Sequence, residues 1–115
     1  MRVIVCGSRT WSDEAAIAER LDQLPRWGLT IVHGGARGAD NVAGLWASGA
    51  GVDVEPFPAD WDTHGRSAGP IRNQQMLDAG ADLVIAFRSD GVSKGTDHMC
   101  SIARRRGVRV EVVNP

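Results

Sequence analysis

The 115-residue sequence predicts an α/β protein: a Rossmann-like three-layer sandwich around a mostly parallel, five-stranded sheet. Three observations predict this fold. Short runs of β-branched residues alternate along the chain with segments of helical periodicity. The candidate strands are apolar almost throughout, as parallel strands are when helices cover both faces of their sheet. Finally, the length is that of one domain, so we expect a single domain over residues 1–115.

The first half of the chain contains two strands and two helices. Arg2–Cys6 (RVIVC) is a compact β-branched run and predicts the first strand. Asp13–Leu24 follows with apolar residues at helical spacing, and Ser12 is a candidate N-cap for this helix. Leu29–His33 predicts the second strand, and Ala39–Ala50 predicts the second helix.

The second half repeats the alternation. Val52–Phe57 predicts the third strand, and Pro70–Ala79 predicts a helix with proline in its first turn. Asp82–Phe87 is the most apolar strand candidate, which places it at the centre of the sheet. Thr96–Arg106 predicts the last helix, whose arginines suit the negative end of the helix dipole. Val108–Val113 completes the sheet.

Right-handed crossovers between these elements predict the strand order 3-2-1-4-5. The loops that leave the carboxyl ends of the strands then gather at one edge of the sheet, where open α/β folds bind ligands. These loops are long and polar, and they cover residues 7–11, 33–40, 58–73 and 88–97. The loops at the opposite edge are short and contain few residues with reactive or ligand-binding side chains. The sequence therefore predicts a site at one edge of the sheet only.

Glycine marks two of the strand-to-helix junctions, in HGGARGAD (residues 33–40) and in SKGT (residues 93–96). Glycine there lets an anion approach the free amide groups at a helix N-terminus. Arginine supplies planar donors for phosphate oxygens, and the loops contain Arg9, Arg37, Arg66 and Arg72. We expect the amides of Gly35, Gly38 and Gly95 to converge with these arginines in a single oxyanion pocket.

Some loop residues have more than one interpretation. Asp40 either caps its helix, pairs with Arg37, or accepts a hydrogen bond from a ribose hydroxyl, as Asp60 also can. Trp61 either stacks on a base or covers its own loop.

Composition excludes several classes of protein. The formal net charge is −1, which argues against a dedicated binder of duplex DNA. No apolar run has the length of a signal peptide core or a membrane span. Cys6 and Cys100 lack metal or redox spacing, so we expect buried free thiols in a reducing, cytoplasmic environment. We interpret Trp27 and Trp46 as packing residues.

Known cofactor motifs are also missing. The chain has neither GxxxxGK[ST] nor GxGxxG, which disfavours a P-loop kinase and an NAD dehydrogenase. His33, His64 and His98 lack the spacing of metal ligands. We therefore expect no metal and no cofactor.

Five ordered segments carry a family resemblance: VCGSRTW, VHGGARGAD, FPADW, GPIRNQQM and AFxxxxxSKGTxxM. In this order they resemble the YspA-type branch of the SLOG superfamily, which also includes the DNA-processing protein DprA (Smf) and the LOG phosphoribohydrolases. The resemblance runs from Val5 to about Ala103. It implies a Rossmann-like domain that binds nucleotides, nucleotide derivatives or nucleic acid.

The resemblance also implies roles for single residues. In the LOG enzymes a glycine-threonine step holds a phosphate, and Gly95-Thr96 matches it here. An arginine on the preceding helix helps to cleave the N-glycosidic bond, and Arg72 occupies the similar place. The glutamate that follows in those enzymes is absent, and Asp97 and His98 are the candidates to act as acid or base instead.

Three functions therefore compete. The first is a sensor or binding module for a nucleotide or nucleotide-derived small molecule. The second is a hydrolase that splits the base from a nucleoside 5′-monophosphate, with Arg72, Asp97 and His98 as catalytic residues. The third is a single-strand nucleic-acid binder like DprA, against which the neutral charge and the few aromatic residues count. The related LOG enzymes form dimers, which raises a homodimer as a partner.

Taken together, the loops and the resemblance predict a set of ligand-binding residues. These are Gly7, Ser8, Arg9, Gly34, Gly35, Arg37, Gly38, Asp40, Asp60, Trp61, Arg66, Arg72, Asn73, Lys94, Gly95 and Thr96.

Overall fold

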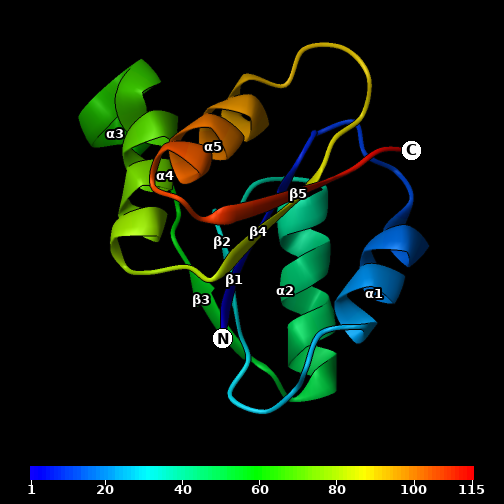
Figure 1. The fold of residues 1–115 in the computed structure, drawn as a ribbon. Helices are drawn as coiled ribbons and strands as arrows, with labels where there is room; N and C mark the ends of the chain where they lie inside the picture. Colours follow the sequence, from blue (N-terminus) through cyan, green and yellow to red (C-terminus); the bar gives the residue numbers. More distant parts are fainter.

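A computed structural model describes residues 1–115 and contains one five-stranded sheet, in which all neighbouring strands are parallel (Figure 1). The strand order is β3-β2-β1-β4-β5, which confirms the predicted fold class and order. The strands are β1 (Arg2–Gly7), β2 (Thr30–His33), β3 (Asp53–Pro56), β4 (Leu83–Phe87) and β5 (Arg109–Val113). Because β1 and β4 lie side by side in the middle, the chain changes its winding direction between them, and a crevice is expected beyond their carboxyl ends.

Helices cover both faces of the sheet (Figure 1). The helices are α1 (Glu14–Asp22), α2 (Ala39–Ala50), α3 (Trp61–His64), α4 (Ala68–Asp78) and α5 (Lys94–Arg105), and a 3-10 turn covers Gly65–Ser67. α1 and α2 lie together on one face, and α4 and α5 lie together on the other (Figure 1). None of these helices combines the length and the apolar composition that a membrane crossing requires.

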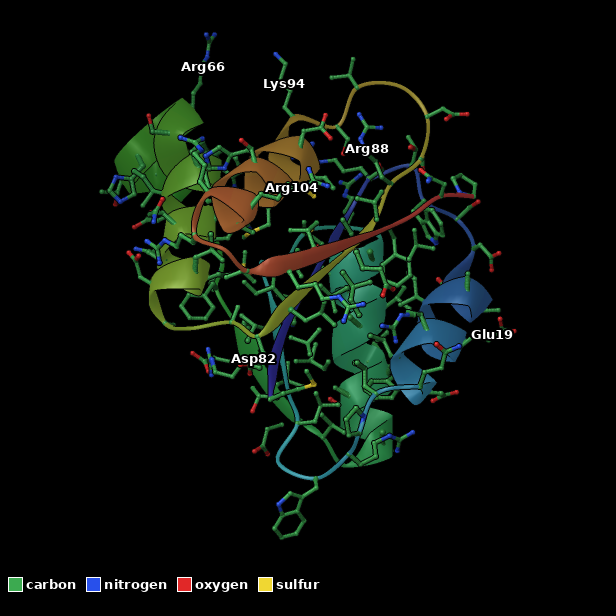
Figure 2. All side chains as sticks on the ribbon, in the orientation of Figure 1. Glu19, Arg66, Asp82, Arg88, Lys94 and Arg104 are labelled. Carbon is green, nitrogen blue, oxygen red and sulfur yellow. The ribbon has the colours of Figure 1, made fainter.

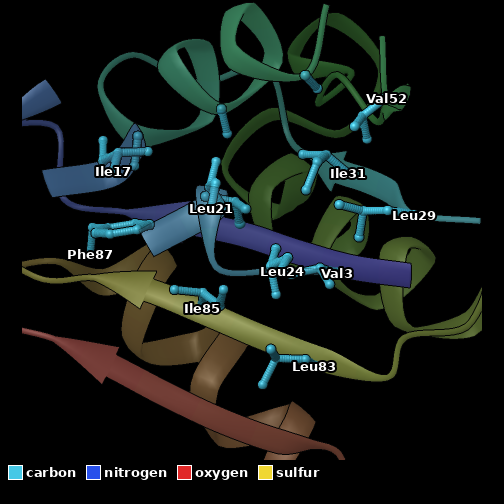
Figure 3. Close-up of a cluster of buried hydrophobic side chains, with 14 of the residues drawn as sticks. Val3, Ile17, Leu21, Leu24, Leu29, Ile31, Val52, Leu83, Ile85 and Phe87 are labelled. Carbon is cyan, nitrogen blue, oxygen red and sulfur yellow. The ribbon is translucent and has the colours of Figure 1, made fainter. Parts of the chain in front are cut away.

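Two buried clusters form the core, one on each side of the sheet. Figure 3 shows the first cluster, in which Val3, Ile85 and Phe87 of the sheet pack with Ile17 and Leu21 of α1. Because one apolar cluster lies on each face of the sheet, the central strands are buried on both faces, and their sequences are therefore continuously hydrophobic. The second cluster contains both cysteines, and the prediction that they are buried free thiols is confirmed.

Most element boundaries differ from those predicted by one or two residues, and three differences change the interpretation. Ser12 does not cap α1; the side chain of Asp13 accepts a hydrogen bond from the amide of Ala16 instead, at 3.0 Å. The segment after β3 is not one long loop, because Asp60 caps the short helix α3 by accepting from Thr63 N at 3.1 Å. Aspartate is a strong N-cap, and in both places it defines the start of a helix. α5 begins at Lys94 rather than at Thr96, so the glycine-threonine step lies inside its first turn.

The interpretation of Trp27 as a packing residue is wrong. Its side chain is 96% exposed in the turn between α1 and β2, which runs over the surface at the amino ends of the strands. Trp46 does pack: its indole N–H donates to Asp22 at 2.8 Å, and the Arg26 guanidinium lies 5.0 Å from its ring centroid. A tryptophan in a tight turn has no neighbouring element to bury it, whereas one on a helix face does.

Replacing Gly7 by alanine is expected to lower the free energy of unfolding by about 2 kcal/mol. A Cβ atom there would lie 2.6 Å from the carbonyl oxygen of Phe87 and 2.7 Å from the Cβ of Ala39, so β1, β4 and α2 would have to separate. Equilibrium unfolding in urea measures the change. The matched control is Gly49→Ala, a helical position with no atom within 4 Å, which should raise stability by up to about 1 kcal/mol. Equal effects of the two substitutions would contradict the close packing at Gly7.

Candidate functional site

Two adjoining cavities lie at the carboxyl ends of the strands, and we call them together the carboxyl-edge cleft. The first has a volume of about 340 Å³ and the second of about 410 Å³, both within the range of small-molecule sites. Arg9, Ala36 and Arg72 line both cavities and so lie at their junction. The expected single pocket is therefore divided in two. The first cavity is also lined by Cys6, Gly7, Thr10, Asp40, Asn73, Met76, Val92, Ser93, Lys94, Gly95 and Thr96. The second is also lined by Gly34, Gly35, Arg37, Pro58, Ala59 and Trp61.

Arg72 is the cation that the fold holds most firmly in the cleft. It projects from α4, and its Nη1 donates to the carbonyl oxygen of Gly34 at 2.6 Å while its Nε donates to Asn73 Oδ1 at 3.1 Å. These bonds use two of the five N–H donors of the guanidinium. Burial lowers the pKa of Arg72 from its ordinary value, but a guanidinium stays charged in proteins. The side chain is thus oriented in advance and keeps donors for an anion.

Gly34 is held from both sides by charged side chains. Its N–H donates to the Asp40 carboxylate at 2.7 Å, and its carbonyl oxygen accepts from Arg72. A Cβ at position 34 would lie 2.2 Å from Arg72 Nη1. The glycine therefore makes room for a side chain of the protein itself, and Asp40 acts neither as a helix cap nor as a partner of Arg37 but as the anchor of this loop.

The other glycines of this loop do not offer free amides to the cleft either. The N–H of Gly35 donates to His33 Nδ1 at 3.0 Å. Gly38 lines neither cavity; it has a φ of 78°, and a Cβ there would lie 3.0 Å from the carbonyl oxygen of Ser8. The predicted role of these amides in anion binding is therefore not supported, and Gly38 serves the close approach of two loops.

The N-terminus of α5 does offer free amides to the first cavity. Ser93, the N-cap residue, makes no capping bond with its side chain. The N–H groups of Lys94, Gly95 and Thr96 precede the first possible intrahelical bond, and the helix dipole makes this end positive. All four residues line the first cavity. Asn73 fixes the helix end by donating from Nδ2 to the carbonyl oxygen of Gly95 at 3.1 Å.

The cleft is strongly basic although the whole chain carries a net charge of −1. Its charged residues are four cations, Arg9, Arg37, Arg72 and Lys94, and one carboxylate, Asp40. Burial raises the pKa of Asp40 to about 6, against the opposing effects of the Gly34 N–H and of Arg72. The three cations other than Arg72 form no hydrogen bond or ion pair from their side chains within the protein, so their charge is available to a ligand.

Two side chains, those of Ser8 and Arg88, fix the loop that follows β4. Ser8 Oγ accepts from the amide of Ser89 at 3.0 Å and so ties this loop to the one after β1. Arg88 binds the Asp97 carboxylate at 2.6 and 3.0 Å and donates to the carbonyl oxygen of Gly91 at 3.0 Å. The loop that carries Val92 and Ser93 into the first cavity is therefore braced at both ends.

Several predicted site residues lie outside both cavities. Asp97 is paired with Arg88, and His98 Nδ1 lies 3.1 Å from Asn73 Nδ2. Asp60 caps α3, and the side chain of Arg66 points away from the body of the molecule (Figure 2). Ser8 and Gly38 act through loop packing, as described above.

Sequence reasoning missed eight lining residues. They are Cys6, Thr10, Ala36, Pro58, Ala59, Met76, Val92 and Ser93. Six of the eight lie in the loops at the carboxyl ends of the strands, which the sequence analysis assigned to the site. Their position in these loops was the only feature of the sequence that could have identified them. Cys6 and Met76 lie in regular elements, where no sequence pattern distinguishes a lining residue from a core residue.

Gly95→Ala is expected to weaken the binding of inorganic pyrophosphate about tenfold without weakening the fold. In the free protein a Cβ at Gly95 meets nothing within 4 Å, and alanine in the first turn of α5 favours the helix by up to about 1 kcal/mol. An anion on the amides of this turn would meet the new methyl group. Isothermal titration and urea unfolding measure the two effects. Gly49→Ala is the control, with higher stability and unchanged affinity; unchanged affinity in Gly95→Ala as well would remove α5 from the anion site.

The chain is similar in sequence to a known family and to one phage protein. Residues 1–64 match the model of the family described as YAcAr, "YspA, cpYpsA-related SLOG family". The chain is also similar to the "Gene 61 protein" of Mycobacterium phage D29, with 45% identity over 117 residues that cover 95% of this chain and 93% of that protein. No solved structure matches the chain.

Proposed function

Because the chain belongs to the YspA, cpYpsA-related SLOG family, we propose that it binds a nucleotide or nucleotide derivative in the carboxyl-edge cleft and acts as a binding or sensing module. The phosphate of the ligand is the group that the cleft recognises. Arg72 contacts it from one side and the first amides of α5 contact it from the other.

One observation carries this proposal. Arg72 is oriented by Gly34 and Asn73, keeps unused donors, and lines the same cavity of about 340 Å³ as the open N-terminus of α5. Arginine side chains and helix N-termini both bind phosphate oxygens in proteins. The position at the change of winding between β1 and β4 is also where open α/β sheets bind nucleotides.

The positions of the acidic residues and of His98 favour binding over hydrolysis. Hydrolysis of an N-glycosidic bond needs an acid or base within hydrogen-bond reach of the reacting atoms. Asp97 lies outside both cavities in an ion pair with Arg88, and His98 lies outside them beside Asn73. Asp40 does line the first cavity, but its carboxylate already anchors Gly34.

The proposal is tested by titrating the protein with AMP, GMP, CMP and UMP and with their diphosphates. Thermal unfolding and isothermal titration report binding, since a ligand at about 100 times its Kd stabilises the fold by roughly 2.7 kcal/mol. Chromatography of the same mixtures reports any released base. We expect stabilisation by at least one nucleotide and no product. Release of base that disappears in Arg72→Ala would establish the hydrolase instead, and no stabilisation by any nucleotide or by pyrophosphate would end the proposal.

A further inference from the structure

The two cysteines of the chain come together in the fold. Cys6 belongs to β1, and Cys100 belongs to α5, a helix that packs against β1. Both side chains lie in the buried cluster between the sheet and the helices α4 and α5. A side-chain hydrogen bond joins the two thiols, which we call the thiol pair. The sequence spacing gives no sign of this pair, because it forms between the first strand and the last helix.

Cys6 also lines the first cavity of the cleft, whereas Cys100 lines neither cavity. Alternate side chains of a strand point to opposite faces, so Cys6 points toward α4 and α5 as Ile4 does, while Val5 faces α1 and α2. Met76 of α4 lines the same cavity and belongs to the same cluster as Cys6. A small polar molecule that enters this cavity of about 340 Å³ therefore reaches one member of the thiol pair first.

The hydrogen bond makes the two thiols chemically unequal. It raises the pKa of Cys6 well above its ordinary value, and burial acts in the same direction. It lowers the pKa of Cys100, so Cys100 is the first of the two to lose its proton. The thiolate is the reactive form of cysteine, and Cys100 in this form accepts the hydrogen bond from the S–H of Cys6. A base thus lies beside the thiol that lines the cavity.

We propose that Cys6 and Cys100 form a modification site, at which hydrogen peroxide converts the thiol pair into a disulfide. Cys6 Sγ attacks one oxygen of the peroxide, the O–O bond breaks, hydroxide leaves, and the proton of Cys6 passes to the Cys100 thiolate. Cys6 is then a sulfenic acid. Cys100 Sγ attacks its sulfur, the S–O bond breaks, and the hydroxyl group leaves as water with the proton of Cys100. The two sulfur atoms lose two electrons in total, and the peroxide gains them. This site does not depend on the proposed function, because no nucleotide takes part.

The thiol pair lies close to the amides that the cleft offers to a phosphate. Cys100 follows Thr96 by about one turn of α5, and Cys6 precedes Gly7 in the wall of the first cavity. A covalent bond holds two sulfur atoms closer than a hydrogen bond does, so closing the disulfide moves α5 relative to β1. We therefore expect the oxidised protein to bind pyrophosphate about fivefold more weakly than the reduced protein, and dithiothreitol to restore the affinity. Dithiothreitol does not reverse oxidation of Met76, so the restoration separates the two events.

Intact-mass spectrometry of the 115-residue chain tests the site. The reduced protein is mixed with a small excess of hydrogen peroxide at neutral pH, alkylated, and weighed without a reducing agent. We expect the loss of two hydrogen atoms, no thiol left to alkylate, and a rate that does not change with protein concentration. The control is the same protein unfolded in urea, which should form the disulfide about tenfold more slowly, because only the fold brings the thiols together. Equal rates in the folded and the unfolded protein would overturn the proposal.

Two single substitutions separate the roles of the thiols. Cys100→Ala removes the base, and Cys6→Ala removes the sulfur that lines the cavity. Each variant should consume peroxide about tenfold more slowly than the wild type and form no intramolecular disulfide. Urea unfolding shows that the variants are folded, and the comparison of folded with unfolded wild type does not depend on them. A wild-type rate in either folded variant would mean that each thiol reacts alone, and the pair would be overturned.

The failures of this site and of the proposed function are distinguishable. If the disulfide forms but the affinity for pyrophosphate stays the same, the modification site stands and its effect on the cleft is overturned. If the reduced protein does not bind pyrophosphate, the proposed function fails, and the mass measurement still decides the modification site.

Discussion

Replacing Arg72 by alanine is expected to weaken the binding of inorganic pyrophosphate, and of any nucleotide that binds, by roughly 100-fold or more. The substitution removes a charged donor that both cavities share, and it also releases the Gly34 carbonyl that this side chain holds at 2.6 Å. Charge-assisted hydrogen bonds each contribute about 1.5–3 kcal/mol, so the loss of the pair at a phosphate accounts for the factor. Isothermal titration of the wild type and the variant measures it.

Two further variants show whether the loss of affinity comes from the position and shape of the Arg72 side chain or only from its charge. Arg66→Ala removes an arginine that points away from the cleft and should leave the affinity unchanged (Figure 2). Arg72→Lys keeps the charge but loses the planar fork, so its affinity should fall between those of the wild type and the alanine variant. Equal losses in Arg66→Ala and Arg72→Ala would mean that only the overall charge matters and not the cleft.

Asp40→Asn is expected to raise the free energy of unfolding by up to about 3 kcal/mol at pH 8 and to leave it nearly unchanged near pH 4. Burial raises the pKa of this carboxyl to about 6 from an ordinary value of 3.8. Between these values the folded protein keeps a proton on Asp40 that the unfolded chain has released, so the contribution of Asp40 to wild-type stability falls as the pH rises from about 4 to 6. Asparagine does not titrate, and its amide oxygen can still accept from Gly34.

The measurement is urea unfolding of both proteins at unit steps from pH 4 to pH 8. The difference between them should grow through pH 6 and then become constant. Asp62→Asn removes an exposed carboxylate that forms no hydrogen bond or ion pair through its side chain, and it should show a difference near zero at every pH. A constant difference for Asp40→Asn across the range would show that the carboxyl titrates normally.

The sheet and its order could be predicted because hydrophobic burial leaves a strong periodic signal. β4 is the clearest case, since all five of its residues are buried and its sequence, LVIAF, is continuously apolar. Parallel strands and right-handed crossovers leave few topologies, so the segregation of polar loops to one edge followed from the order of the elements. Helix ends were less predictable, because Asp13 and Asp60 cap helices by local hydrogen bonds that compete with other turn geometries.

The sequence predicted many of the residues that line the candidate site, but it did not predict how the glycines of the site act. A glycine in a strand-to-helix turn has the same sequence signature whether it admits a ligand or a side chain. Only the structure shows that Gly34 makes room for Arg72, from a helix 38 positions away, and that the amide of Gly35 is already bound by His33. The division into two cavities likewise depends on where α3 places Trp61, and that short helix had been predicted as loop.

The most direct test of phosphate recognition is a titration of ¹⁵N-labelled protein with inorganic pyrophosphate, followed by amide NMR. The account predicts progressive shifts of the backbone amides of Lys94, Gly95 and Thr96 and of the Arg72 Nε–H, and none at Trp27 at the far edge of the sheet. Shifts that avoid these four groups, or none at millimolar pyrophosphate, would contradict it.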